Sequence, residues 1–293
     1  MCTLKQLPLP SDLCLIRIHH NSLQIRIPGR GEELKTFVIN LDRSADRLAF
    51  MQEQAAEHGI TIDRIRAVEG TEVPAWLARE FRGPHRLSPG EIGCYASHLV
   101  VAKHIVASEI AWALVLEDDA KLAPGFSELI AKAVSSAPEG WDIIHLSSNF
   151  KKSVIFTAEL ISGYRLIRYT QGPITTTAYL VSHSGARKIL FPGSRVRPID
   201  VDRRYAWQRQ LDILGVYPAP VVQHQILKST IAKDRTYPRA NPVSFAYGVI
   251  WTARKVGITA FLSGWRSNYM NSIRKFFGIP YKIIIVRDEV STH

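Results

Sequence analysis

Apolar residues recur along the chain with two alternating periods, one typical of buried strands and one typical of amphipathic helices. Short apolar or β-branched runs predict strands at Lys35–Leu41, Thr61–Val68, Ala111–Leu116, Trp141–Ser147, Tyr164–Tyr169 and Gly172–Val181. Segments with apolar positions three and four residues apart predict helices at Asp42–His58, Ser88–Ser108, Phe126–Ser135, His183–Leu190 and Arg203–Asp212. Strands and helices therefore alternate from Lys35 to about Gln225, which predicts an α/β fold with a mainly parallel sheet flanked by helices.

Three carboxylates, Glu117, Asp118 and Asp119, directly follow the buried run Ala111–Leu116. Adjacent acids repel one another, and a hard cation such as Mg²⁺ or Mn²⁺ that binds carboxylate oxygens would relieve this repulsion. Ligands of open α/β sheets bind at the carboxyl ends of strands, where these acids are expected. The alternative is an acidic turn in solvent. The buried strand before the acids and Pro124–Gly125 after them favour a metal or nucleotide site.

Polar residues also mark the ends of two other predicted elements. The first strand ends near Asn40, and the following helix start carries Arg43 and Arg47, which could bind a phosphate or ribose at a helix N-terminus. Solvated arginines in a first turn explain the same pattern. A second helix begins at the capping sequence Ser88–Glu91 and carries His98, which by itself is most simply a core-facing histidine.

Asp200 and Asp202 lie two residues apart in Pro198–Asp202, just before the predicted helix Arg203–Asp212. Aspartate directly before a helix is favoured as a cap. The pair is therefore consistent either with a helix cap or with a chemical role.

Charge is distributed unevenly along this chain, whose formal net charge is +11. From Lys228 to Arg287 there are eleven basic residues and one acid, whereas the rest of the chain has 26 basic and 25 acidic residues. The main fold is therefore nearly neutral, which argues against a nucleic-acid cleft running through it. Three cysteines without metal-ligand spacing, no secretory signal and no membrane-spanning run predict a cytoplasmic protein.

Aromatic and basic residues are interleaved beyond residue 240. Phe245, Trp251 and Trp265 alternate in sequence with Arg254, Lys255, Arg266 and other basic residues. Basic amphipathic helices with this pattern bind anionic membrane surfaces, so residues 245–287 are expected to contact one. The alternative is that these helices pack on the main domain. The predicted organisation is an N-terminal extension (1–33), a main α/β domain (34–227) and a basic amphipathic helical C-terminal region (228–293).

The order of these motifs resembles glycosyltransferase family 25, which includes bacterial lipooligosaccharide galactosyltransferases and the collagen galactosyltransferases. The resemblance covers about residues 35–225. It is carried by Val38–Arg43 with Asp46 and Arg47, Leu87–His98, Leu114–Asp119, Thr177–Ser182 with Gly185 and Ala186, and Pro198–Asp202.

The resemblance implies a GT-A-like, Rossmann-type fold, a UDP-sugar donor, usually UDP-galactose, and inversion at the sugar carbon. On the Asp-x-Asp motif usual in such folds, Glu117 takes the first acidic position and Asp119 the second. Asp119, with Glu117, would then bind Mn²⁺ or Mg²⁺, and Glu117 could also contact the ribose. The other implied donor-binding residues are Asn40, Arg43, Arg47, Ser97, His98 and Asp118. Asp200 or Asp202 would be the base that deprotonates the acceptor hydroxyl.

The leading hypothesis is an inverting glycosyltransferase that adds a hexose, first of all galactose, to a cell-surface glycan precursor such as lipooligosaccharide. Its acceptor would be an oligosaccharide or a lipid-linked glycan at the inner face of a bacterial inner membrane, and the segments Glu72–Arg86, Phe150–Ser162 and Ser194–Asp202 are the loops expected to select it. The alternative is a catalytically silent nucleotide-sugar or glycan-binding scaffold, which Glu117 in place of Asp keeps open. A metal-dependent nucleotidyltransferase is less consistent with the sequence, because no glycine-rich phosphate loop follows the first strand.

Overall fold

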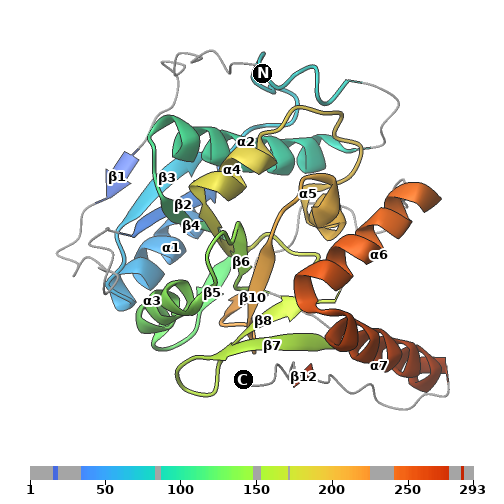
Figure 1. Cartoon of the computed structure of the whole chain (residues 1–293). Coiled ribbons are helices and arrows are strands. Elements are labelled where there is room, and N and C mark those ends of the chain that lie inside the picture. The colour runs from blue at the N-terminus through green and yellow to red at the C-terminus, as the bar shows by residue number, and fades with distance from the viewer. Residues whose placement is uncertain are drawn as a thin grey trace.

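One large sheet organises the chain in the computed structural model, which describes residues 16–18, 34–82, 87–147, 153–170, 172–224, 241–276 and 285–286 (Figure 1). Ten strands of this part of the chain form the sheet in the order β1-β3-β2-β4-β9-β6-β10-β8-β7-β12. In chain order they are β1 (Ile16–Ile18), β2 (Lys35–Asn40), β3 (Ile62–Arg66), β4 (Trp112–Glu117), β6 (Ile143–His145), β7 (Val154–Glu159), β8 (Arg165–Tyr169), β9 (Ala178–Ser182), β10 (Ile213–Tyr217) and β12 (Ile285–Val286). A separate pair joins β5 (Ala120–Leu122) to β11 (Val221–Gln223).

The sheet is mixed, and its strand directions place the site. Strands β3, β2 and β4 are parallel, as are β6 and β10. Strand β9 runs antiparallel between β4 and β6. The predicted α/β class is confirmed, and the parallel arrangement holds for the three strands that carry the first motifs. Because β9 is reversed, its amino-terminal end lies beside the carboxyl end of β4.

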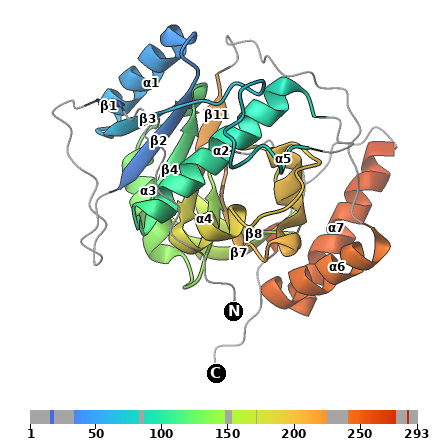
Figure 2. The same ribbon diagram turned by 90° about the horizontal axis from the view of Figure 1, so that it is seen from above.

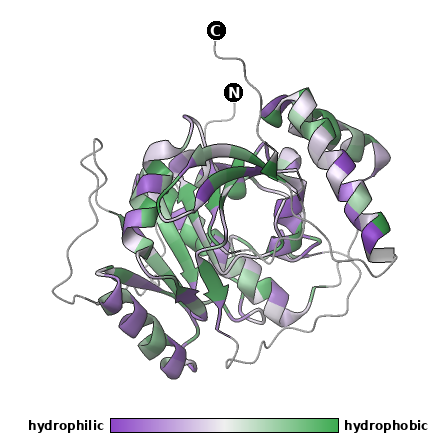
Figure 3. Cartoon of the chain, turned by 90° about the horizontal axis from the view of Figure 1, so that it is seen from below, coloured by the Kyte–Doolittle hydropathy of each residue, from purple (hydrophilic) through white to green (hydrophobic). Residues whose placement is uncertain are grey.

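Helices cover both faces of the sheet (Figure 2). They are α1 (Ala45–Glu57), α2 (Pro89–Ala107), α3 (Phe126–Ser136), α4 (His183–Ile189), α5 (Ile199–Asp202), the 3₁₀ helix η1 (Arg203–Gln208), α6 (Pro242–Val256) and α7 (Ile258–Phe276). Alternate residues of β4 face opposite layers: Leu114 and Leu116 pack with α1 and α3, whereas Ala113 and Val115 pack with α2 and α4. The central strands are accordingly hydrophobic (Figure 3), as a sheet buried on both faces requires.

Helix α2 begins where its capping sequence predicts. The Ser88 hydroxyl accepts a hydrogen bond from the Glu91 amide (3.3 Å), and the Glu91 carboxylate accepts one from the Ser88 amide (2.6 Å). These reciprocal bonds satisfy two of the four amides that a helix start leaves unpaired. The cap fixes the register of the helix that carries His98.

Several predicted segments have a different structure, including an expected loop and an expected helix. The expected loop Phe150–Ser162 contains strand β7, which pairs with β8. The expected helix Arg203–Asp212 ends as a 3₁₀ helix at Gln208, and strand β10 follows. Strand β7 forms a hairpin with the adjacent β8, whereas β10 pairs with the distant strands β6 and β8; the local hydrophobic period records neither pairing.

The predicted boundaries at residues 33 and 227 remain predictions. Of the N-terminal extension only Ile16–Ile18 is described, as a strand beside β3. The C-terminal region contains α6 and α7, and the described residues include no helix long and apolar enough to cross a bilayer. The rest of the segment expected at a membrane, apart from Ile285 and Val286, lies outside the described residues.

Candidate active site

Glu117 is the last residue of β4 and is held from two sides. Its Oε1 accepts hydrogen bonds from the Thr176 hydroxyl (2.6 Å) and lies 3.2 Å from Nε2 of His98 on α2. Burial raises the pKa of Glu117, but the bonds from His98 and Thr176 and the charge of Arg203 outweigh burial and lower it. Glu117 is therefore an ionised carboxylate at neutral pH.

Asp118 is tied to the neighbouring strand and helix. Its Oδ2 accepts a hydrogen bond from the Asn40 side chain at the end of β2 (2.9 Å), and its Oδ1 pairs with Arg47 of α1 (2.9 Å). Both carboxylate oxygens of this buried residue are thus used within the protein. Because each oxygen has a partner within the protein, Asp118 links the ends of β2 and β4 and the start of α1.

Asp119 differs from its neighbours because one of its oxygens has no partner. Its Oδ2 accepts a hydrogen bond from Gln223 of β11 (2.7 Å), whereas Oδ1 is buried without a hydrogen bond to any described residue. Burial and the charges of Glu117 and Asp118 raise the pKa of Asp119 to about 6. An unpaired buried carboxylate oxygen is costly, and a divalent cation would remove that cost. The donor set therefore fits a hard metal ion at Asp119, with Glu117 beside it.

A second group of possible metal ligands, Cys94, His98 and Glu117, lies within 4.8 Å. Burial raises the pKa of the Cys94 thiol well above its ordinary value, and burial lowers the pKa of His98. Both nitrogens of His98 already have partners, Glu117 and the Tyr179 hydroxyl (2.9 Å). A protonated thiol and an engaged imidazole are poor ligands, so this group fits a metal less well than Asp119 does.

Five predicted donor-binding residues lie around this edge, each with partners in the protein. The buried Asn40 side chain also accepts a bond from Arg64 (3.0 Å). Arg43 is exposed and pairs with Glu69. The Ser97 hydroxyl accepts from the Val68 amide (2.8 Å) and donates to the Gly93 carbonyl (2.7 Å), so it fastens α2 to the end of β3. Asn40, Arg47 and His98 therefore contact the acidic residues directly, whereas Arg43 and Ser97 are bonded elsewhere.

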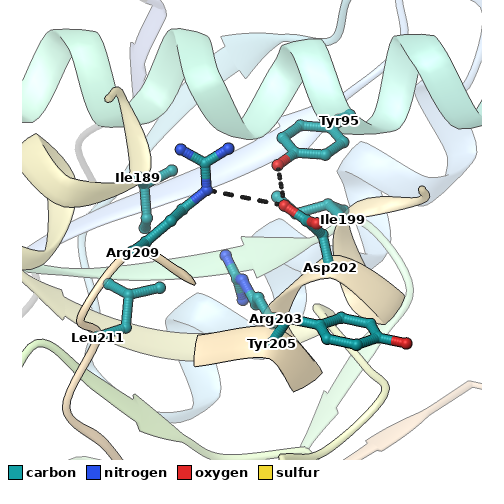
Figure 4. Close-up of a pocket in the computed structure, with 8 residues that line it drawn as sticks. All are labelled: Tyr95, Ile189, Ile199, Asp202, Arg203, Tyr205, Arg209 and Leu211. Atoms are coloured by element: carbon teal, nitrogen blue, oxygen red, sulfur yellow. Dashed lines mark hydrogen bonds and ion pairs between the residues drawn. The ribbon is translucent and has the colours of Figure 1, made fainter. Parts of the chain in front are cut away.

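The two aspartates of α5 have different surroundings. Asp202 lines a small pocket, where it accepts a hydrogen bond from the Tyr95 hydroxyl (2.8 Å) and faces Arg209 at 3.7 Å (Figure 4). Its other oxygen pairs with Arg197 at 3.1 Å. This carboxylate therefore ties α5 to α2 and to the surrounding loops.

Asp200 has fewer bonds than Asp202. Its Oδ1 accepts a hydrogen bond from the Val201 amide (2.8 Å). Burial raises the pKa of Asp200, and the charge of Glu117 acts in the same direction. With a raised pKa and no ion pair to a described cation, Asp200 is the better candidate for a general base.

Sequence reasoning missed three residues that complete this region. Thr176 and Gln223 bind two of the acids, and Tyr179 binds His98. The guanidinium of Arg203 lies 3.8 Å from the ring centroid of Tyr179 and is buried without a hydrogen bond to any described residue. The Thr175–Thr177 run is a visible signal in the sequence, but threonine is β-branched and the run therefore predicts a strand.

The fold is that of an α/β protein, with a group of acidic side chains at the carboxyl ends of β2 and β4, where such sheets bind ligands. A family model described as glycosyltransferase family 25 (LPS biosynthesis protein) matches residues 33–203, more than half of the chain. The chain belongs to glycosyltransferase family 25.

Several curated relatives match over this part of the chain. A glycosyltransferase 25 family member of Aedes aegypti is 29% identical over 185 residues, 56% of this chain and 29% of the relative. Procollagen galactosyltransferase 2 of Mus musculus is 27% identical over 180 residues, 56% of this chain and 29% of the relative. An inactive glycosyltransferase 25 family member 3 of Mus musculus is 28% identical over 216 residues, 63% of this chain and 36% of the relative. The chain thus spans about a third of the length of these relatives, and the family supports a role in glycosyl transfer.

Proposed function

We propose that this protein is an inverting glycosyltransferase that moves a hexose, with galactose as the first candidate, from a UDP-sugar to a hydroxyl group of a glycan. The observation that carries the proposal is the buried Asp119 oxygen in the turn after β4, which has no hydrogen-bond partner among the described residues. It lies where α/β sheets bind ligands, in a chain of a glycosyltransferase family. Galactose is chosen because relatives named galactosyltransferases are among the matches.

A divalent ion, Mn²⁺ or Mg²⁺, would be held by Asp119 with Glu117, and it would neutralise charge on the donor diphosphate. The Arg47 side chain pairs with Asp118 and is 20% exposed. It is therefore the cation beside these acids best placed to meet a nucleotide phosphate. Neutral His98 on α2 contacts Glu117, so the Glu117 carboxylate keeps one orientation. The protein residues thus position the donor before any bond changes.

The transfer step requires a base on the face of the sugar opposite the diphosphate. Asp200 would take the proton of the acceptor hydroxyl while that oxygen forms a bond to the anomeric carbon. The bond from this carbon to the diphosphate oxygen breaks, and its electron pair leaves with UDP. Asp202, bonded to Tyr95, Arg197 and Arg209, would hold α5 in place.

The direct test is release of UDP from a panel of UDP-hexoses and UDP-N-acetylhexosamines, with Mn²⁺, Mg²⁺ or EDTA. We expect slow hydrolysis of one donor by the wild-type protein, lost with EDTA and in Asp119→Asn. The exposed Glu139 on the loop after α3 provides the control variant Glu139→Gln, which should behave like the wild type. Metal binding is measured separately by calorimetry, so loss of the metal is distinguished from loss of catalysis.

A second candidate is a catalytically silent scaffold that binds a nucleotide sugar or glycan. A relative of similar identity is named inactive, which is the observation that favours it. Binding of UDP without turnover of any donor, even when a lipid-linked glycan extract is supplied as acceptor, would support the scaffold and contradict the enzyme.

A further inference from the structure

We infer that the hairpin formed by α6 and α7 is a docking surface for the anionic face of a phospholipid bilayer. The two helices lie together at one side of the molecule, away from α1 and β1 (Figures 1 and 2). This inference does not depend on the proposed catalytic activity, because it concerns a surface remote from the acidic edge of β4.

Exposed apolar side chains are concentrated on this hairpin. Ten of the thirteen large hydrophobic residues that are exposed in the described part of the chain belong to it. They are Val243, Phe245, Tyr247, Val249, Ile250, Ile258, Leu262, Trp265, Tyr269 and Met270. Exposed apolar patches on soluble domains mark interaction surfaces.

Trp265 and Tyr269 form the most distinctive part of this surface. They lie one turn apart on α7, their rings stack at 6.2 Å with an interplanar angle of 15°, and they are 62% and 59% exposed. Trp and Tyr are the residues enriched at the boundary between lipid and water, because each combines a large apolar ring with a polar group.

The apolar surface continues into an open cleft between the hairpin and the sheet domain. The cleft has a volume of about 1250 Å³, and its walls include Phe245, Trp251 and Leu262 from the hairpin and Trp207 from η1. Apolar side chains are thus offered from both helices. A bilayer can cover such a surface, because binding to lipid does not require a partner of complementary shape.

The charge of the hairpin favours an anionic partner. Residues 241–276 contain five basic residues and no acid. Arg254 and Arg266 are exposed, whereas Lys255 pairs with Asp212. A second copy of the chain would bring a surface of the same sign, which is unfavourable. An anionic lipid surface attracts each basic residue that lies close to it.

The mode of contact is interfacial. The described residues include no helix able to span a bilayer, and α7 has polar contacts to the sheet domain through Ser267 and Asn268. The hairpin therefore docks with one face on the protein and presents the other to the lipid, as amphipathic interfacial helices do.

Vesicle co-sedimentation of the full-length protein tests the inference. Vesicles of phosphatidylcholine alone are compared with vesicles that also contain phosphatidylglycerol, at low and high salt. We expect binding to the anionic vesicles that weakens with salt. The double variant Arg254→Gln/Arg266→Gln should lower the partition coefficient at low salt by about 30-fold. The double variant Trp265→Ser/Tyr269→Ser should lower the partition coefficient by about tenfold or more.

Matched controls remove similar groups elsewhere. Lys132→Gln/Arg187→Gln deletes two exposed charges on α3 and α4, and Phe191→Ser deletes an exposed aromatic ring after α4. Both controls should bind as the wild type does. In the bound state, lipids spin-labelled near the headgroup should quench tryptophan fluorescence of the wild type more than that of Trp265→Phe.

Three outcomes would overturn the inference. The first is equal binding to neutral and anionic vesicles, and the second is hairpin variants that cannot be distinguished from the controls. The third is a protein that ignores all vesicles but dimerises with increasing concentration in a way abolished by Trp265→Ser/Tyr269→Ser, which would assign the surface to a second copy.

Discussion

Glu117, Asp118 and Asp119 are consecutive in sequence, yet each carboxylate has a different environment. His98 and Thr176 bind the first, Asn40 and Arg47 bind the second, and only the third keeps a buried oxygen without a described partner. The protein therefore pairs Asp118 with a cation and Glu117 with hydrogen-bonding groups, while one oxygen of Asp119 is left for another ligand. The raised pKa of Asp119, about 6, follows from burial beside those two neighbours.

The two aspartates of α5 should respond differently to amidation. Asp200→Asn should abolish transfer while leaving the stability nearly unchanged, because it removes the base but no ion pair. Asp202→Asn should lower the free energy of unfolding by about 1–3 kcal/mol, because Arg197 and Arg209 lose their charged partner. Urea denaturation and turnover measurements on both variants check this.

The pH profile gives the corresponding control. Because the pKa of Asp200 is raised above its ordinary 3.8, the acid limb of kcat/KM in the wild type should lie above that value. Asp202→Asn should retain the limb. If Asp200→Asn retains full turnover instead, Asp200 is not the base.

His145 makes stability depend on pH. It is fully buried, neither ring nitrogen has a described partner, and burial with the nearby charge of Arg203 lowers its pKa well below 6.5. The unfolded chain takes up a proton at this residue below about pH 6.5, whereas the folded protein does not. The free energy of unfolding is therefore not reduced by His145 above that pH. As the pH falls below it, His145 lowers the free energy of unfolding by about 1.4 kcal/mol per pH unit.

Replacing the ring tests this assignment. His145→Leu should flatten the dependence of the free energy of unfolding on pH between 6.5 and 5 by about one proton equivalent. Thermal or urea unfolding across that range measures it. An unchanged slope would mean that other groups, such as His58 and His104, whose pKa values burial also lowers, account for the acid sensitivity.

At the scale of elements, the position of α2 determines the geometry of the site. Gly93 lets the helix approach the end of β3, since a Cβ atom there would lie 2.4 Å from the Val68 carbonyl oxygen. Ser97, one turn later, bonds the Val68 amide. These contacts bring His98 to Glu117, so a shift of the helix would change the orientation of the carboxylate.

Gly93→Ala should therefore lower stability by about 1–3 kcal/mol through overpacking and also reduce turnover. The exposed Gly90 in the first turn of the same helix supplies the control, because Gly90→Ala should be neutral or stabilising by up to about 1 kcal/mol. Differential scanning calorimetry and the UDP-release assay measure both effects. Equal stability of the two variants would show that α2 can move without cost.

At the scale of the whole molecule, specific polar and packing contacts attach the α6–α7 hairpin to the rest of the described chain. The Asn268 side chain accepts a hydrogen bond from the Ser153 amide (2.8 Å) and donates one to the Thr170 hydroxyl (3.0 Å). Trp207 packs on α6 at Gly248, where a Cβ atom would lie 2.5 Å from the indole ring. These contacts fix the hairpin to β7, β8 and η1 rather than to the acidic edge.

Asn268→Ala should loosen α7 selectively. Losing both bonds should cost about 1–3 kcal/mol, and it should raise amide hydrogen exchange in residues 258–276 while amides of α1 to α4 keep their protection. Ser272→Ala, which removes only an exposed bond to the Asn268 carbonyl, is the control. Increased exchange across the whole sheet would contradict a hairpin that opens independently.

Much of the fold was predictable because its signals are local. The strand β4, the capped helix α2 and the alternation of elements follow from hydrophobic period and capping residues, which act within a few positions of the chain. Strand β10 was not predicted because it is defined by pairing with the distant strands β6 and β8, and β7 was not predicted although it forms a hairpin with the adjacent β8. The reversed direction of β9 is of the same kind, since strand direction depends on the path of the chain and not on composition.

The sequence by itself determined the fold class, the family and the acidic residues at the end of β4, because each is recorded in residue types at fixed spacing. Only the tertiary structure separated their roles. It paired Asp118 with Asn40 and Arg47, left one oxygen of Asp119 without a partner among the described residues, and bound Asp202 to side chains from other elements. These partners are up to about a hundred positions apart in sequence, and hydrogen bonds and burial at that separation exist only once the chain has folded.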